Sequence, residues 1–150
     1  MHFWKLLIAL LITVNLSAQE GGTTELSWVT DFGEAKALAA ERDAAVLMVF
    51  AGSDWCRPCI QLKQNVLDQA AFAEAMRDEL VVLYLDFPAK KKNQLTEVQV
   101  RHHEALAERY NRLGAFPKLV LLNADEEVLA EPDYKGQNVE AFIDLLTARE

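Results

Sequence analysis

The sequence predicts an α/β fold in which a central mixed sheet is flanked by helices. Two continuous apolar runs, residues 44–51 and 80–87, have the length expected of strands that are buried on both faces. Segments with apolar residues at helical spacing separate these runs, and such alternation predicts a parallel core. The last two short apolar runs, 118–123 and 127–131, are joined by a three-residue turn and must therefore pair antiparallel.

Capping residues mark the starts of three predicted helices. Asp31, with a glutamate three residues later, is placed to cap a helix over 32–42. Thr96, with a glutamine three residues later, has the spacing of a capping box, and Asn138 is placed to cap the last helix. If the apolar patch at 26–29 is counted as a first strand, the predicted order is β-α-β-α-β-α-β-β-α.

The helix that follows Thr96 carries two adjacent histidines. Its predicted apolar stripe places His102 in the core as a packed, hydrogen-bonded residue and turns His103 toward water. Gly114 is expected to end this helix. The residues that share the predicted stripe are Leu95, Val98, His102, Leu106, Tyr110 and Leu113.

The first residues have the organisation of a secretory signal peptide. One lysine precedes an apolar run over 6–16, which is shorter than the ~20 residues that a membrane-spanning helix needs. We expect cleavage after Ala18, which makes residues 1–18 the signal, 19–25 a flexible lead-in and 26–150 the folded domain. The protein would then be periplasmic or secreted, unless the signal is retained as an anchor.

Composition and charge narrow the classes of partner. The 150 residues suit one domain, and 51% of them are hydrophobic, so the chain can bury a core without a disulfide. The formal net charge of -8 argues against nucleic acid and anionic lipid as partners, because both recruit lysine and arginine. We expect a monomer.

Both cysteines lie in the stretch WCRPC. Cys56 falls where a strand ends and a helix begins, so free N–H groups and the helix dipole would stabilise its thiolate and lower its pKa below about 8.5. Arg57 adds a nearby cation, and Pro58 fits the first helical turn. Cys59 follows about one turn later, where its sulfur can reach that of Cys56. Trp55 would cover the pair and offer an apolar contact to a partner chain.

Other uses of the cysteine pair fit the sequence less well. A structural disulfide over so short a loop would restrain little chain entropy. A zinc site needs a second pair of ligands, and the adjacent His102 and His103 would point to different sides of a helix. Haem attachment needs a histidine after the second cysteine, where Ile60 stands. We therefore expect a redox pair with neither a metal nor a cofactor.

The stretch WCRPC resembles the WCxPC centre of the thioredoxin superfamily, and residues 108–123, ERYNRLGAFPKLVLLN, resemble that family's helix, cis-proline loop and strand. Residues 26–149 follow the order of elements in that fold. The sequence around the cysteines looks most like exported bacterial thioredoxin-like proteins of disulfide interchange. The resemblance implies a thioredoxin-like fold, with Cys56 as the attacking thiol, Cys59 as the resolving thiol and Pro117 as a cis-proline that faces the disulfide.

The sequence departs from the pattern of that family in three places. Thioredoxins carry a buried acid in the strand before the motif, whereas residues 46–52 are apolar and Asp54 lies in the loop. Asp54 is either a loop-capping acid or a neighbour that opposes thiolate formation. Phe116 stands before the cis-proline, where Thr or Val is common, and makes the substrate rim bulkier. The segment 88–105 is longer than the usual link and is either a partner-docking surface or a solvated extension.

These features predict a thiol–disulfide oxidoreductase that exchanges disulfides with exported proteins, as a reductase or in interchange rather than as an oxidase. Pro58 is shared with reducing members of the superfamily, whereas Arg57 stabilises the reduced state and makes the pair more oxidising. A reductase outside the cytosol would need an electron source, such as a membrane-bound donor. The alternative is a thioredoxin-fold binding or assembly module with incidental cysteines, whose rim of Trp55 and Phe116 would hold an unfolded chain.

Overall fold

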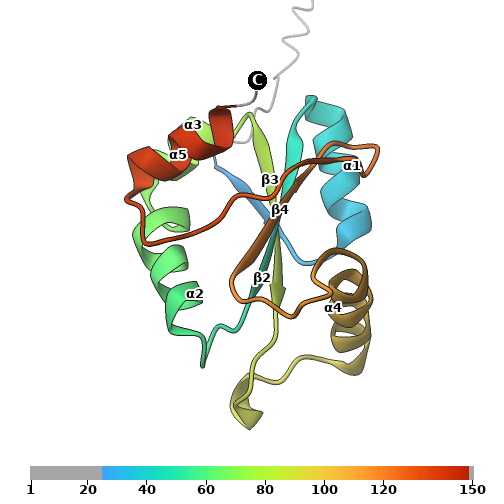
Figure 1. Ribbon diagram of the computed structural model, residues 1–150. Helices are drawn as coiled ribbons and strands as arrows, with labels where there is room; N and C mark the ends of the chain where they lie inside the picture. Colours follow the sequence, from blue (N-terminus) through green and yellow to red (C-terminus); the bar gives the residue numbers. More distant parts are fainter. Residues whose placement is uncertain (1–24, 149–150) are drawn as a thin grey trace, which may run out of the picture.

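The computed structural model describes residues 25–148, which form a mixed sheet with helices on both faces (Figure 1). The predicted signal peptide, residues 1–18, lies outside the described residues, as does the lead-in before residue 25. The strands are β1 Ser27–Val29, β2 Ala45–Ala51, β3 Leu80–Asp86, β4 Lys118–Leu122 and β5 Val128–Ala130. Their order across the sheet is β1-β3-β2-β4-β5, so the predicted α/β architecture with a mixed sheet is confirmed.

The helices form two layers, one on each face of the sheet. They are α1 Phe32–Arg42, α2 Arg57–Leu62, α3 Ala70–Met76, α4 Glu97–Tyr110 and α5 Val139–Thr147, with a π-helical turn at Lys63–Leu67 and a 3-10 turn at Lys91–Asn93. α2, α3 and α5 pack on one face, where Phe72 lies against Phe142, and α1 and α4 pack on the other (Figure 1). Within residues 25–148, none of the helices has the length and apolar character needed to cross a membrane.

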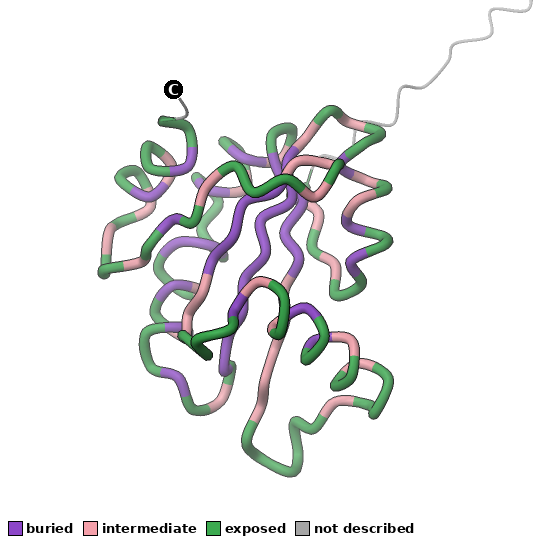
Figure 2. The backbone as a smooth tube through the Cα atoms, turned by 45° about the vertical axis from the view of Figure 1, so that its right-hand side comes forward, coloured by how far each residue is buried: buried purple, intermediate pink, exposed green. Residues whose placement is uncertain are grey.

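β2 and β3 lie at the centre of the sheet and carry both cores. Along β2, Leu47 packs on the α2 side, while its neighbours Val46 and Met48 pack on the α1 side. All of β2 is buried. Figure 2 shows the buried backbone concentrated in these central strands. The expectation of a strand that is buried on both faces is therefore confirmed.

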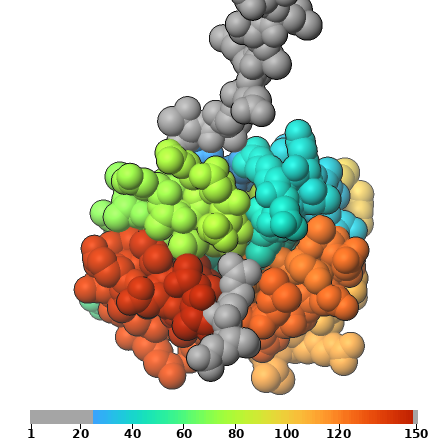
Figure 3. Space-filling model, turned by 90° about the horizontal axis from the view of Figure 1, so that it is seen from above, coloured from blue at the N-terminus to red at the C-terminus, as the bar shows by residue number. Residues whose placement is uncertain are grey.

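β4 runs antiparallel to β2, so the parallel part of the sheet is limited to β1, β3 and β2. The register pairs Ala51 with Asp86 and Phe50 with Lys118. β4 therefore begins at the end of the sheet where β2 and β3 finish, although alternation alone predicts a return to the other end. β4 and β5 pair antiparallel, as their short connection predicts. One end of the sheet thus gathers the loops after β2, after β3 and before β4. Figure 3 shows the opposite end, where α3 and α5 lie side by side and the end of α1 adjoins the turn between β4 and β5.

α4 is rotated relative to the predicted stripe. His103, which we predicted to face water, is only 2% exposed, and Val98 and Leu113, which we placed in the stripe, are 69% and 97% exposed. His102 is half-buried rather than in the core, but it is hydrogen-bonded as predicted, because its Nε2 accepts a bond from the backbone N–H of Phe32 at 3.1 Å. The reason is that Nδ1 of His103 donates a hydrogen bond to the carbonyl oxygen of Asp86 at 2.9 Å, which anchors α4 to the end of β3 and sets its rotation.

The predicted helix caps agree with the structure better than the predicted rotation of α4 does. Asp31 caps α1 by accepting a hydrogen bond from the N–H of Glu34 at 2.8 Å. The capping box that starts at Thr96 and the cap at Asn138 are also present. Gly114 does not end α4, which finishes at Tyr110. Local hydrogen bonds thus explain where helices begin, because they need no tertiary partner.

Burial lowers the pKa of His103 below its ordinary value of 6.5. The unfolded chain then binds a proton that the folded chain resists, so stability is lost as the pH falls through about 6.5. The free energy of unfolding in urea should be lower at pH 5 than at pH 7.5, and His103→Gln should reduce that difference. His102→Gln on the same helix is the control. Equal pH dependence in wild type and H103Q would contradict this role for burial.

Candidate functional site

A disulfide joins Cys56 to Cys59 just beyond the end of β2. Cys56 is the N-cap of α2, and its Sγ accepts a hydrogen bond from the backbone N–H of Cys59 at 3.3 Å. The two residues are buried, with 4% and 2% of their surface exposed. The sulfur of Cys56 therefore sits where a helix offers free N–H donors and partial positive charge, and these would stabilise a thiolate once the disulfide is reduced.

Arg57 and Pro58 form the first turn of α2, as predicted, and both are exposed. Pro58 has no N–H to donate, and at this helical position the missing donor costs little. Within residues 25–148, the guanidinium of Arg57 has no carboxylate in an ion pair with it. Arg57 therefore presents an exposed cation in the first turn of α2.

The indole of Trp55 is 51% exposed but fixed in place. Its Nε1 donates a hydrogen bond to the carbonyl oxygen of Phe87 at 2.7 Å, and its ring packs edge-on against Phe116, with centroids 5.3 Å apart. The ring also lies over Gly52, where an added Cβ would come within 2.3 Å of it. An exposed aromatic group that is already rigid can bind a partner with little further loss of entropy.

The peptide bond between Phe116 and Pro117 is cis, as expected. Pro117 directly precedes β4, whose first residue pairs with Phe50 near the end of β2. The loop before β4 therefore lies at the same end of the sheet as the disulfide. Asn111 holds this loop, because its side chain both donates to and accepts from the backbone of Ala115, at 2.8 and 2.9 Å.

Phe87 is a third aromatic residue of this rim, and the sequence analysis missed it. Its ring lies 5.4 Å from that of Phe116, centroid to centroid, and its carbonyl oxygen holds Trp55. The available signal was its position, since it ends the apolar run 80–87 next to Pro88. An aromatic residue at the carboxyl end of a strand parallel to the strand before the cysteines would reach the same edge of the sheet.

The loop before Cys56 is bonded to β3 on both sides of Asp54. Ser53 donates through its N–H and its Oγ to the carboxylate of Asp86, at 2.9 and 2.6 Å. Trp55 is bonded to the residue that follows Asp86, as described above. The loop that presents Cys56 is therefore held by the end of a central strand.

Asp54 is a loop-capping residue, the first of the two roles that the sequence left open. Its carboxylate accepts hydrogen bonds from the N–H groups of Ala89 and Lys90, at 2.8 and 3.0 Å, and from the side-chain amide of Asn93 at 2.9 Å. These bonds, that from Ala89 foremost, lower the pKa of Asp54, so the carboxylate stays ionised near neutral pH. Asp54 thereby ties the extended segment after β3 to the motif loop.

β2 supplies only apolar side chains beside the disulfide, as the sequence indicates. The polar groups of this region come instead from β3. Burial raises the pKa of Tyr84 to about 12, and the charges of Asp86 and Asp68 act in the same direction, so its phenol stays protonated. Asp86 is the carboxylate at this end of β3, and it is engaged with Ser53.

The fold and the cysteine pair together define a thioredoxin-like domain with a C-x-x-C disulfide at the start of a helix. The chain belongs to the thioredoxin-like family, because the model of that family matches residues 27–124. This stretch includes both cysteines, Trp55 and Pro117.

Two relatives come from Chlamydia pneumoniae. The disulfide bond reductase DsbH is 28% identical over 118 residues, which cover 79% of this chain and 69% of that protein. The thioredoxin-related protein DsbJ is 25% identical over 126 residues, which cover 81% of this chain and 35% of that protein. The chain thus spans about a third of the length of DsbJ.

Two solved structures of thioredoxin-fold proteins are similar to this chain. A DsbH oxidoreductase superposes with a TM-score of 0.75 at 26% identity, covering 83% of this chain and 83% of that one. A thioredoxin from Thermus thermophilus has a TM-score of 0.59 at 22% identity, covering 81% of this chain and 84% of that one, and shares the fold. The relatives and the Cys56–Cys59 disulfide support thiol–disulfide oxidoreductase as the class of this chain.

Gly52→Ala should displace the indole of Trp55, because the new methyl group would overlap the ring. We expect a loss of about 1–3 kcal/mol in the free energy of unfolding and a change in the fluorescence of Trp55, measured in a background with Trp4→Phe and Trp28→Phe so that Trp55 is the one tryptophan of the sequence. Gly33→Ala is the control for the fluorescence, since its added Cβ would meet the capping oxygen of Asp31 at 3.1 Å and no atom of Trp55 within 4 Å. Unchanged fluorescence in G52A would show that Gly52 does not set the position of Trp55.

Proposed function

We propose that this chain reduces or interchanges disulfides in exported proteins, in the periplasm or outside the cell. The observation that carries the proposal is the position of the Cys56 sulfur at the N-cap of α2, in a disulfide with Cys59 one turn later. Its relative DsbH is a disulfide bond reductase, which supports the reducing direction.

In this direction the thiolate of Cys56 attacks one sulfur of a substrate disulfide. A mixed disulfide forms, and the other substrate sulfur leaves as a thiolate that takes up a proton. The thiol of Cys59 then loses its proton and attacks the sulfur of Cys56, so that the second substrate sulfur leaves in turn. Two electrons pass to the substrate, and the chain is left with the Cys56–Cys59 disulfide.

A repeated cycle needs a reductant that returns two electrons to this disulfide. Outside the cytosol the thiol pools that keep cysteines reduced are absent. A membrane-bound dithiol donor is therefore the class of partner that we propose, and its dithiol would be oxidised to a disulfide as the Cys56–Cys59 pair is reduced.

Five residues are proposed to serve the cysteines in two different ways. Trp55 and Phe116 would bind the substrate chain, since together they form a rigid apolar rim next to Cys56, and the adjoining Pro117 would complete it. Arg57 and Pro58 would tune the thiols. Arg57 favours the thiolate and hence the reduced pair, whereas Pro58 is the feature shared with reducing relatives.

Equilibration with glutathione buffers should give a reduction potential more negative than about -180 mV. Arg57→Ala should make it more negative still, because the reduced pair loses a stabilising cation. Arg77→Ala, at the far end of α3, is the control and should leave the potential unchanged. A potential well above -180 mV would assign the chain to the oxidants and reject the reducing direction.

Cys59→Ser should trap mixed disulfides between Cys56 and exported proteins, because the resolving thiol is gone. Cys56→Ser should trap none, and non-reducing gel electrophoresis followed by mass spectrometry distinguishes the two variants. The rival function is a thioredoxin-fold binding or assembly module with incidental cysteines. It requires that a variant with serine at both positions keeps full activity in the host, and that result would displace the enzyme proposal.

A further inference from the structure

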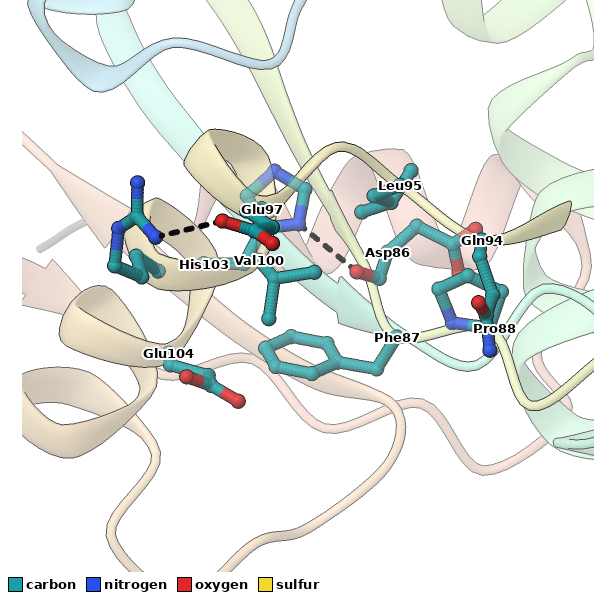
Figure 4. A pocket seen from close by; sticks show the side chains of 10 residues that line it. Asp86, Phe87, Pro88, Gln94, Leu95, Glu97, Val100, His103 and Glu104 are labelled. Atoms are coloured by element: carbon teal, nitrogen blue, oxygen red, sulfur yellow. Dashed lines mark hydrogen bonds and ion pairs between the residues drawn. The ribbon is translucent and has the colours of Figure 1, made fainter. Parts of the chain in front are cut away.

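A pocket of about 530 Å³ lies between the segment that follows β3 and the first turns of α4 (Figure 4). We propose that this pocket receives an apolar side chain of the polypeptide whose disulfide is exchanged, with a neighbouring cationic side chain of the same polypeptide held at Glu104. The inference rests on the function proposed above, and it gives the segment 88–105 the partner-docking role that the sequence left open.

The pocket has an apolar floor. Phe87, Pro88, Leu95 and Val100 line it, and Val100 is 38% exposed although it is a large hydrophobic residue. Figure 4 shows the ring of Phe87 lying below Val100, with Glu104 to one side of the ring. A leucine-sized side chain that entered this space would remove apolar surface of both partners from water.

The pocket is continuous with the rim of the disulfide. Phe87 both lines the pocket and contacts Phe116, with centroids 5.4 Å apart, and Phe116 contacts Trp55 at 5.3 Å. The contacts Trp55–Phe116 and Phe116–Phe87 therefore connect the residue before Cys56 with the pocket. An extended chain rises ~3.3 Å per residue, so about three residues would separate the cysteine of the substrate from the side chain in the pocket.

The walls of the pocket carry an unbalanced negative charge. Arg101 forms an ion pair with Glu97 at 3.5 Å, and the carboxylate of Asp86 is engaged with Ser53. Glu104 is exposed and, within residues 25–148, has no cation paired with it. A cationic group beside the apolar side chain would complement Glu104, and the chain's net charge of -8 acts in the same sense.

The position of the pocket is fixed by the motif loop itself. Asp54 binds the N–H groups of Ala89 and Lys90, which lie just beyond Pro88 in the pocket wall. On the other side, His103 is buried against Phe87, with ring centroids 6.0 Å apart. The pocket is therefore held at a fixed position relative to the disulfide. An extended polypeptide can contact both at once only if this position does not change.

The test compares disulfide-linked dimers of short peptides as substrates of the reduced chain. Each peptide has one cysteine, and a leucine–lysine pair stands three residues from it, on the N-terminal side in one series and on the C-terminal side in the other. In at least one series, replacing the leucine with alanine should lower kcat/KM about tenfold through KM, as expected for partial burial of a leucine side chain. Replacing the lysine with glutamate should also raise KM.

Matched variants of α4 locate the effect. Val100→Lys should abolish the preference for leucine, whereas Val98→Lys should preserve it, because Val98 is 69% exposed on the same helix and does not line the pocket. Glu104→Gln should abolish the preference for lysine over glutamate, and Glu108→Gln should preserve it. Thermal unfolding of each variant checks the fold, and reduction of oxidised glutathione, which is too small to span both points, should be equal in all four.

Equal KM values for the leucine and alanine peptides in both series would overturn the inference, as would identical behaviour of V100K and V98K. If wild type reduces neither the peptides nor oxidised glutathione, the proposed function fails instead. The pocket is then tested by binding alone, with peptides that carry serine in place of cysteine and with the fluorescence of Trp55 as the probe, in the same W4F and W28F background. Weaker binding to V100K than to V98K would support the pocket in that case, and equal binding would reject it.

Discussion

Three hydrogen bonds from the loop after β3 converge on the carboxylate of Asp54, two residues before Cys56. Without this acceptor, the N–H groups of Ala89 and Lys90 would have only water as a partner, and the segment beyond Phe87 would lose these bonds to the motif loop. Ser53 and Trp55, the residues on either side of Asp54, are hydrogen-bonded to the last residue of β3 and to the residue after it. The position of the disulfide, the aromatic rim and the pocket therefore all follow from how one short loop is fastened to a central strand.

The disulfide lies at the border between an apolar core and a polar helix start. Cys56 and Cys59 belong to the same core cluster as Leu62 and Phe72, and β2 offers them no ionisable group. The N–H donors at the start of α2, that of Cys59 among them, would stabilise a thiolate at this border. Burial thus disfavours the thiolate form of Cys56, whereas the local N–H donors favour it. The balance between these two effects sets the redox behaviour of the pair.

The sequence predicted features that depend on local chemistry and missed features that depend on packing. The capping of α1 by Asp31, the two buried central strands and the cysteine pair at a helix start are all encoded within a few residues. The rotation of α4 is not, because it is set by a hydrogen bond between His103 and a carbonyl on another element. The same applies to Phe87, whose role depends on which strands are neighbours, and to Asp54, whose partners lie 35 to 39 residues away.

Both edges of the sheet are short. β1 spans Ser27–Val29 and β5 spans Val128–Ala130, so each edge offers only three residues of unpaired strand backbone. A protein that handles unfolded or misoxidised chains meets many segments able to add a strand to an exposed edge. Edges this short give such segments little backbone to pair with, so under the proposed function a substrate chain would be bound mainly by side-chain contacts near the cysteines.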